Sequence, residues 1–109
     1  MVKFIALYQQ PEDPTAFDEY YQNVHLPLCH KIPNLLKVEI ARVTGTPRGP
    51  SNYYMMVSLY FQDEATMMAA LTSEAGMATA KDARNFAKEI FSGHFAVCEE
   101  ITVTNGVIA

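Results

Sequence analysis

The sequence predicts an α+β fold of the ferredoxin-like type, βαββαβ, with a four-stranded antiparallel sheet. Apolar, β-prone runs and helix-like segments alternate in this order along the chain. A length of 109 residues suits one hydrophobic core, so we expect a single domain over residues 1–109. Half of the residues are hydrophobic and only 18% are charged, which indicates apolar surface reserved for a ligand or a partner chain.

The first half of the chain predicts a strand, a helix and a second strand. Residues 2–8 are β-prone and mostly apolar. Asp13 is a candidate N-cap and Pro14 suits the first helical position, so the helix is expected over residues 14–30. Pro33 punctuates the chain before a strand over residues 35–43.

The second half begins with a turn-rich loop over residues 44–52. Residues 53–61 are aromatic and nearly uncharged, as expected of a central strand that is covered on both faces. Asp63 can cap a short helix that ends at Leu71. Ser73 and Glu74 can open a second helix, whose alanines predict close packing.

The last part of the chain is expected to form one more strand. Ser92 and Gly93 are interpreted as the end of the preceding helical segment. The strand is predicted over residues 94–103, followed by a polar, glycine-containing tail over residues 104–109.

Alternation of side chains gives each central strand two different faces. The more aliphatic set is expected against the helices: Ile5, Leu7, Val57, Leu59 and Phe61. The set with tyrosyl hydroxyls and a serine is expected on the face that the helices leave bare: Phe4, Ala6, Tyr8, Tyr54, Met56, Ser58 and Tyr60.

A bare sheet face of this composition is too apolar to remain in water. A second copy packed sheet to sheet would bury it, which predicts a homodimer. Between the two sheets we expect one apolar pocket per subunit, with a few polar groups. The candidate substrate-binding residues are Tyr8, Tyr21, Tyr54, Tyr60, Phe4, Met56 and Ser58.

His25 is the candidate catalytic residue. At 3.6 residues per turn, the stripe that faces the core contains Phe17, Tyr20, Tyr21, Val24 and Leu28, and His25 lies at its margin. Pro27 cannot donate to the carbonyl four residues earlier, so the last turn is expected to open. An imidazole with a pKa near 6.5, roughly its unperturbed value, can exchange protons with a small ligand. Alternatively, His25 only hydrogen-bonds locally and holds the helix end.

Other polar residues have weaker claims on chemistry. His30 is expected to be structural or solvated at a helix end, and His94 to be a surface residue, with a ligand role as the alternative. Glu39 and Arg42 are three residues apart in a strand, so they should point to opposite faces; their roles stay open. In the Glu99–Glu100 pair, one carboxylate is expected on a solvated edge.

Composition and motifs argue against several classes of function. The net charge is −4 and no basic cluster is present, so nucleic acid is not expected as a partner. No apolar run approaches the ~20 residues that span a bilayer, which favours a cytoplasmic protein without membrane association. Cys29 and Cys98 lack zinc-site spacing and are expected to be reduced packing residues, and we expect no metal and no cofactor. Glycine-rich phosphate loops and hydrolase motifs are also absent from the sequence.

Several short motifs together resemble the EthD family. The most specific is His-x-Pro-Leu at residues 25–28, and the resemblance extends over essentially the whole chain. The motifs of the first half are Leu7-Tyr8, Pro11-Glu12-Asp13, Phe17-Asp18-x-x-Tyr21, Val24-His25-Leu26-Pro27-Leu28, Lys31-Ile32-Pro33 and Leu35. Those of the second half are Tyr53-Tyr54, Leu59-Tyr60-Phe61, Ser73-Glu74-x-Gly76 and Asn85-Phe86-Ala87. Asn34 stands where the family usually has glycine, and asparagine also tolerates left-handed dihedral angles.

The resemblance implies a dimeric α+β barrel built from two ferredoxin-like subunits. It also implies an association with oxidative degradation of small organic compounds, and with redox partners of such a pathway, because the family is named for a gene cluster of ethyl tert-butyl ether degradation. Some relatives are dehydratases or decarboxylases of aromatic polyketides, and similar barrels include isomerases and cofactor-free monooxygenases. An oxidoreductase, a lyase or isomerase, a non-catalytic carrier of an apolar or aromatic metabolite, and a purely structural dimer therefore remain open.

Overall fold

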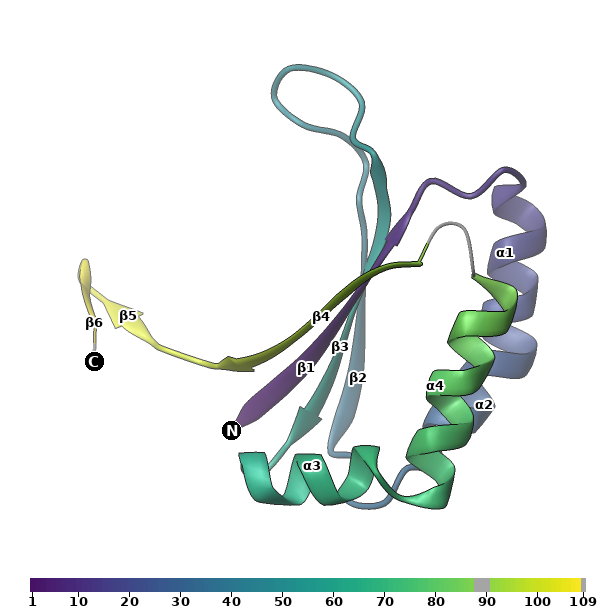
Figure 1. Cartoon of the computed structure of the whole chain (residues 1–109). Helices are drawn as coiled ribbons and strands as arrows, with labels where there is room; N and C mark the ends of the chain where they lie inside the picture. The colour runs from purple at the N-terminus through teal and green to yellow at the C-terminus, as the bar shows by residue number, and fades with distance from the viewer. Residues whose placement is uncertain (88–90, 109) are drawn as a thin grey trace.

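The computed structural model describes residues 1–87 and 91–108, and for residues 91–96 it describes the backbone alone. Four strands form an antiparallel sheet in the order β2-β3-β1-β4 (Figure 1). They are β1 (Val2–Gln9), β2 (Lys37–Arg42), β3 (Tyr53–Phe61) and β4 (Phe91–Glu99). The helices α1, α2 and α4 lie on one side of this sheet (Figure 1). The predicted α+β, ferredoxin-like architecture is therefore confirmed.

The first helical segment is continuous but not uniform. It consists of α1 (Pro14–Tyr20), a π-helical turn η1 (Tyr21–His25) and α2 (Leu26–Cys29). Asp13 is the N-cap, because its side chain accepts a hydrogen bond from the Ala16 amide at 3.1 Å. The predicted start is confirmed. The turn that was expected to open around Pro27 lies earlier than predicted, at Tyr21–His25, and α2 continues through Pro27.

The two helices of the second half begin where their capping residues predict. α3 (Glu64–Leu71) is capped by Asp63, and α4 (Glu74–Phe86) is capped by Ser73. The predicted end of this helical region at Ser92 and Gly93 is wrong, because both residues lie inside β4. Antiparallel pairing of β4 with β1, which begins opposite Tyr8, overrides the local turn signal.

The C-terminal segment differs from the predicted tail. β5 (Val103–Thr104) and β6 (Val107–Ile108) form a two-stranded hairpin, so residues 104–108 are not an irregular tail. Asn105 and Gly106 connect the strands with positive φ angles of 50° and 77°. The Asn-Gly pair is the strongest short-range hairpin signal in a sequence, and its significance was missed.

The register of the two central strands corrects the predicted sheet faces. Phe4 lies opposite Leu59, and Ala6 lies opposite Val57, so these side chains share one face. Ile5 lies opposite Ser58 and therefore points away from the helices, as Leu7 does. The predicted grouping of Phe4, Ala6 and Tyr8 with Met56, Ser58 and Tyr60 is wrong. Alternation separates the two faces of one strand, but only the register matches them to the faces of its neighbour.

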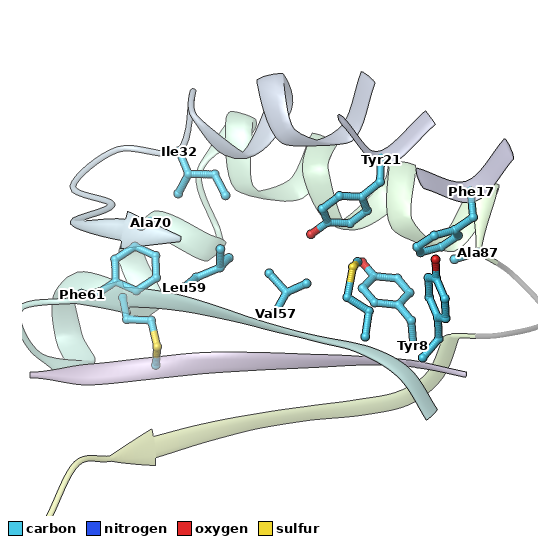
Figure 2. Close-up of a cluster of buried hydrophobic side chains, with 12 residues drawn as sticks. Tyr8, Phe17, Tyr21, Ile32, Val57, Leu59, Phe61, Ala70 and Ala87 are labelled. Atoms are coloured by element: carbon cyan, nitrogen blue, oxygen red, sulfur yellow. The ribbon is translucent and has the colours of Figure 1, made fainter. Parts of the chain in front are cut away.

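The hydrophobic core lies between the sheet and the helices. Figure 2 shows Tyr21 and Ile32 of the helical layer facing Val57 and Leu59 of β3. At one end, Tyr8 packs edge-on against Phe17, with ring centroids 5.5 Å apart. No helix within the described residues is long and apolar enough to cross a membrane.

Candidate functional site

An apolar cavity of about 320 Å³ lies between the helices and the sheet of a single chain. β1 and β3 contribute its floor, and the helical layer contributes its roof. The lining residues are Phe4, Ala6, Tyr8, Tyr21, His25, Cys29, Ile32, Val57, Leu59, Leu71, Gly76, Thr79, Ala80 and Ala83. The pocket predicted from the sequence lies on the opposite face of the sheet, between two subunits; Phe4, Tyr8 and Tyr21, which were expected in it, line this cavity of the single chain instead.

Small side chains on α4 explain why space remains under the helix. Ala80 and Ala83 face the sheet and line the cavity, so no long side chain fills this part of the core. Close packing does occur where α4 begins. A Cβ atom on Gly76 would lie 2.3 Å from the Ala70 carbonyl oxygen, so glycine is required there. The alanines of α4 predicted close packing; Ala87, just after the helix, is buried in the packed core, whereas Ala83 lines the cavity.

His25 lies in this cavity because of the π-helical turn. The residues that face the core are spaced by four: Phe17, Tyr21, His25 and Cys29 are all buried, whereas Val24 is 40% exposed. The amide of Leu26 donates to the Tyr21 carbonyl, five residues earlier, and this wider turn moves His25 from the margin into the core. The predicted stripe through Val24 is therefore wrong. Only 3% of His25 remains exposed.

Asp82 of α4 holds the imidazole in place. His25 Nδ1 lies 2.9 Å from Asp82 Oδ2, and the Tyr20 hydroxyl donates to Asp82 Oδ1 at 2.7 Å. The rings of Tyr21 and Phe86 each lie 5.0 Å from the imidazole, measured between centroids. Sequence reasoning missed Asp82, because Lys81-Asp82 looks like a solvated charge pair; the only signal was an acidic residue in an alanine-rich helix.

The protonation state of His25 follows from this environment. Burial lowers the pKa of His25, and the hydrogen bond and negative charge of Asp82 oppose part of that effect. The imidazole is therefore neutral at pH 7. Since a carboxylate only accepts hydrogen bonds, Nδ1 carries the proton and donates to Asp82, which leaves the lone pair on Nε2. No hydrogen bond to Nε2 is found within the described residues.

The other polar groups of the cavity are also neutral. Burial raises the pKa of both Tyr8 and Tyr21 above the usual tyrosine value. Burial also raises the pKa of the Cys29 thiol to about 11. Cys29 and Cys98 are both free thiols, as predicted. His25 is thus the cavity-lining residue with a titration nearest neutral pH among the described residues.

Four of the predicted substrate-binding residues do not line this cavity: Tyr54, Met56, Ser58 and Tyr60. Tyr54 was expected on the bare sheet face but packs edge-on against Phe17 of α1, with centroids 5.6 Å apart. Its hydroxyl donates to Asp18 and receives a hydrogen bond from Arg42. The register between β1 and β3 shifts beside Tyr54, which explains why this side chain leaves the simple alternation.

Met56, Ser58 and Tyr60 lie on the sheet face opposite the helices, as predicted, and so do not line the cavity. We call this surface the open face; its central members are Lys3, Ile5, Leu7, Lys37, Glu39, Ala41, Met56, Ser58 and Tyr60. The Tyr60 hydroxyl donates to Glu39, which raises the pKa of Tyr60 to about 12 and lowers the pKa of Glu39. Lys37 Nζ lies 4.4 Å from the Tyr60 ring centroid.

The remaining candidates are placed as follows. Glu39 and Arg42 point to opposite faces of the sheet, as their spacing predicts. His30 is exposed and Nδ1 lies 2.8 Å from the Leu26 carbonyl, at the end of α2. The side chain of His94 lies outside the described residues. Asn34 has a φ of 61°, which agrees with its position where glycine is usual. Within the described residues, no three His, Cys, Asp or Glu side chains form a group that could hold a metal ion.

Residues 9–89 match the EthD domain, and this segment includes both His25 and Asp82. The chain belongs to the EthD family. It is 33% identical over 87 residues to an uncharacterized 11.0 kDa protein of the thcB-thcC intergenic region of Rhodococcus erythropolis, with 80% of this chain and 84% of that protein aligned. The crystal structure of an EthD family protein from Bacillus halodurans is 43% identical, with a TM-score of 0.86 over 92% of this chain and 98% of that one.

Two more distant structures share the fold. A dimeric ferredoxin-like protein of Bacteroides fragilis is 16% identical, with a TM-score of 0.60 over 91% of this chain and 95% of that one. SnoaB of Streptomyces nogalater, a cofactor-independent oxygenase, is 12% identical, with a TM-score of 0.65 over 95% of this chain and 96% of that one. At sequence identities this low, the similarity of these two structures supports the fold of this EthD protein and not its function.

Proposed function

We propose that this EthD protein binds a small apolar or aromatic compound in the cavity beneath α4, and that His25 removes a proton from it or anchors one of its oxygen atoms. One observation carries the proposal: a buried, neutral imidazole is oriented by Asp82 at the wall of an apolar cavity of about 320 Å³. Since a cavity of about 150 Å³ accommodates benzene, the volume suits a ligand of two or three rings.

The proposed chemistry begins at Nε2. A hydroxyl or an acidic C–H of the ligand gives its proton to this nitrogen, and the carboxylate of Asp82 stabilises the imidazolium that forms. Oxidation of the deprotonated ligand by dioxygen as co-substrate is one continuation, in which one oxygen atom enters the product and the other leaves as water; the fold likeness to a cofactor-independent oxygenase supports it. Elimination or isomerisation, which needs no oxidant, is the other. We also propose that the protein is cytoplasmic and that residues 1–109 form a single domain. Redox proteins of such a pathway are proposed as its partners.

A non-catalytic carrier is the second candidate. It is favoured by the neutrality of Tyr8, Tyr21 and Cys29, which gives the cavity no activated nucleophile. Such a carrier needs His25 only as a hydrogen-bonding group.

The test compares binding of 2-naphthol and naphthalene by fluorescence titration. Wild-type protein should bind 2-naphthol about fivefold more tightly, since one hydrogen bond contributes roughly 1 kcal/mol. His25→Ala should remove that preference, and His30→Ala, which changes the exposed histidine that follows α2, should retain it. Equal preference in His25→Ala and wild type, with the fold intact by circular dichroism, would contradict the proposal.

His25→Gln separates the two candidates. Native mass spectrometry of the purified wild type would detect any metabolite that co-purifies with it. If the protein is a carrier, the His25→Gln variant should still bind that metabolite, because the glutamine side chain also forms hydrogen bonds. An enzyme should lose turnover of that metabolite, because glutamine does not titrate near neutral pH.

We further propose that the protein is a homodimer, as a neighbour of the same fold is described as dimeric, and that the apolar residues of the open face form the interface. Met56→Lys on the open face should produce monomers in sedimentation velocity. Met68→Lys is the matched control, because Met68 lies on α3 and is 47% exposed. An intact dimer in Met56→Lys would place the interface elsewhere.

A further inference from the structure

The C-terminal residues 103–108 form a β-hairpin whose turn suits its sequence. Positive φ angles at both Asn105 and Gly106 are those of a type I′ turn, which matches the twist of two antiparallel strands. Val103 pairs with Ile108 and Thr104 pairs with Val107. This segment lies outside residues 9–89, which match the EthD domain.

The hairpin exposes an unusual amount of apolar surface. Val103 is 61% exposed, Val107 65% and Ile108 67%, and Ile101 just before the hairpin is 60% exposed. Because Val103 and Ile108 are directly paired, they share one face of the hairpin. A two-stranded hairpin with strands of two residues has too few internal contacts to be stable alone in water. Its apolar face therefore requires a partner surface.

The direction of β4 indicates where that surface lies. β4 is an edge strand of the sheet, and the chain continues from it to the hairpin. Figure 1 shows the hairpin projecting beyond the sheet, on the side away from α1, α2 and α4. Within the described residues, β5 and β6 pack substantially only on each other. The hairpin thus extends into the space on the side of the open face, where a second copy of the chain would lie.

We propose that the C-terminal hairpin clasps the second copy of this chain in the homodimer. This inference rests on the open-face dimer proposed above. Two-fold symmetry makes the contact reciprocal, so that each chain covers the apolar residues of the other's hairpin. A second copy is favoured because the proposed dimer would place it on the open face, on the side to which the hairpin extends, and two-fold symmetry would then bury the apolar residues of both hairpins in one assembly.

The first test is the affinity of the dimer. Val103→Ser combined with Ile108→Ser should raise the dimer dissociation constant at least tenfold, or about 1.4 kcal/mol, in sedimentation equilibrium. Met77→Ser is the matched control, because Met77 is 59% exposed on α4, away from the hairpin. Its dissociation constant should equal that of the wild type.

The second test is hydrogen exchange of the wild-type protein at several concentrations, which does not depend on any variant's folding. Exchange at Thr104, Val107 and Ile108 should be slower in the dimer than in the diluted monomer. Slow exchange at every concentration would mean that the hairpin packs on its own chain, and fast exchange at every concentration would mean that it packs on nothing; either result overturns the clasp. A dimer that Met56→Lys disrupts but the hairpin variant leaves unchanged would retain the open-face interface and refute the clasp alone. A protein that is monomeric throughout would refute both.

Discussion

The substitution Ala83→Leu tests whether the cavity has usable space beneath α4. Ala83 is buried and lines the cavity, and leucine adds three carbon atoms to a helix that tolerates it well. At about 0.8 kcal/mol for each buried CH2, the free energy of unfolding should rise by roughly 2 kcal/mol. The available volume of about 320 Å³ is large enough for this side chain. The same substitution should weaken 2-naphthol binding, because leucine occupies part of the site.

Ala87→Leu is the matched control. Ala87 is 1% exposed and belongs to the packed core, but it does not line the cavity. Added volume at a packed position should lower the free energy of unfolding by about 1 to 3 kcal/mol. Urea denaturation at one fixed protomer concentration measures both variants, since dimer formation makes apparent stability depend on concentration. If Ala83→Leu destabilises the protein as much as Ala87→Leu does, the space beneath α4 is not available and the reasoning fails.

Three other predictions concern the histidine and the start of α4. Asp82→Asn should lower the pKa of His25 further, because it removes the carboxylate that opposes the effect of burial; an unchanged pKa in an NMR titration would argue against the pair. Since the folded-state pKa of His25 lies below its unfolded value, the stability it contributes is complete above about pH 6.5 and is lost as the pH falls toward the folded-state pKa. Urea denaturation from about pH 7.5 to about pH 5.5 should therefore show a steeper loss of stability in wild type than in His25→Gln, and equal slopes would refute the assignment. Gly76→Ala should lower the free energy of unfolding by about 1 to 3 kcal/mol, because its Cβ would lie 2.3 Å from the Ala70 carbonyl oxygen; unchanged thermal unfolding would show that this backbone yields easily.

Local sequence signals predicted the starts of the helices and the central strand well, because residues close in the sequence determine these features. The side chains of Asp13, Asp63 and Ser73 accept hydrogen bonds from amides of the first helical turns, so each helix begins where its cap predicts. The central strand β3 has the predicted bounds because its apolar residues suit no exposed structure. Ser92 and Gly93 misled the prediction, since sheet pairing outweighs a turn preference of two residues.

The candidate site was predicted in part. Phe4, Tyr8, Tyr21 and His25 do line one cavity, and His25 was identified from its position beside Pro27. The face of the sheet that carries this cavity depends on the register between β1 and β3, which neither strand encodes alone. The partner of His25 lies 57 residues along the chain, and only packing of α4 on the first helical segment brings the two side chains together.

The π-helical turn divides the first helical segment into two parts that can be oriented independently. In an uninterrupted α-helix each residue advances by about 100°, so the direction of Phe17 would fix the direction of Cys29. One extra residue in the turn at Tyr21–His25 breaks this relation. α1 can therefore keep its aromatic packing while α2 is rotated to suit the cavity. Deletion of one residue from the turn would preserve both helices yet turn His25 away from Asp82, so the geometry of the site depends on a single inserted position.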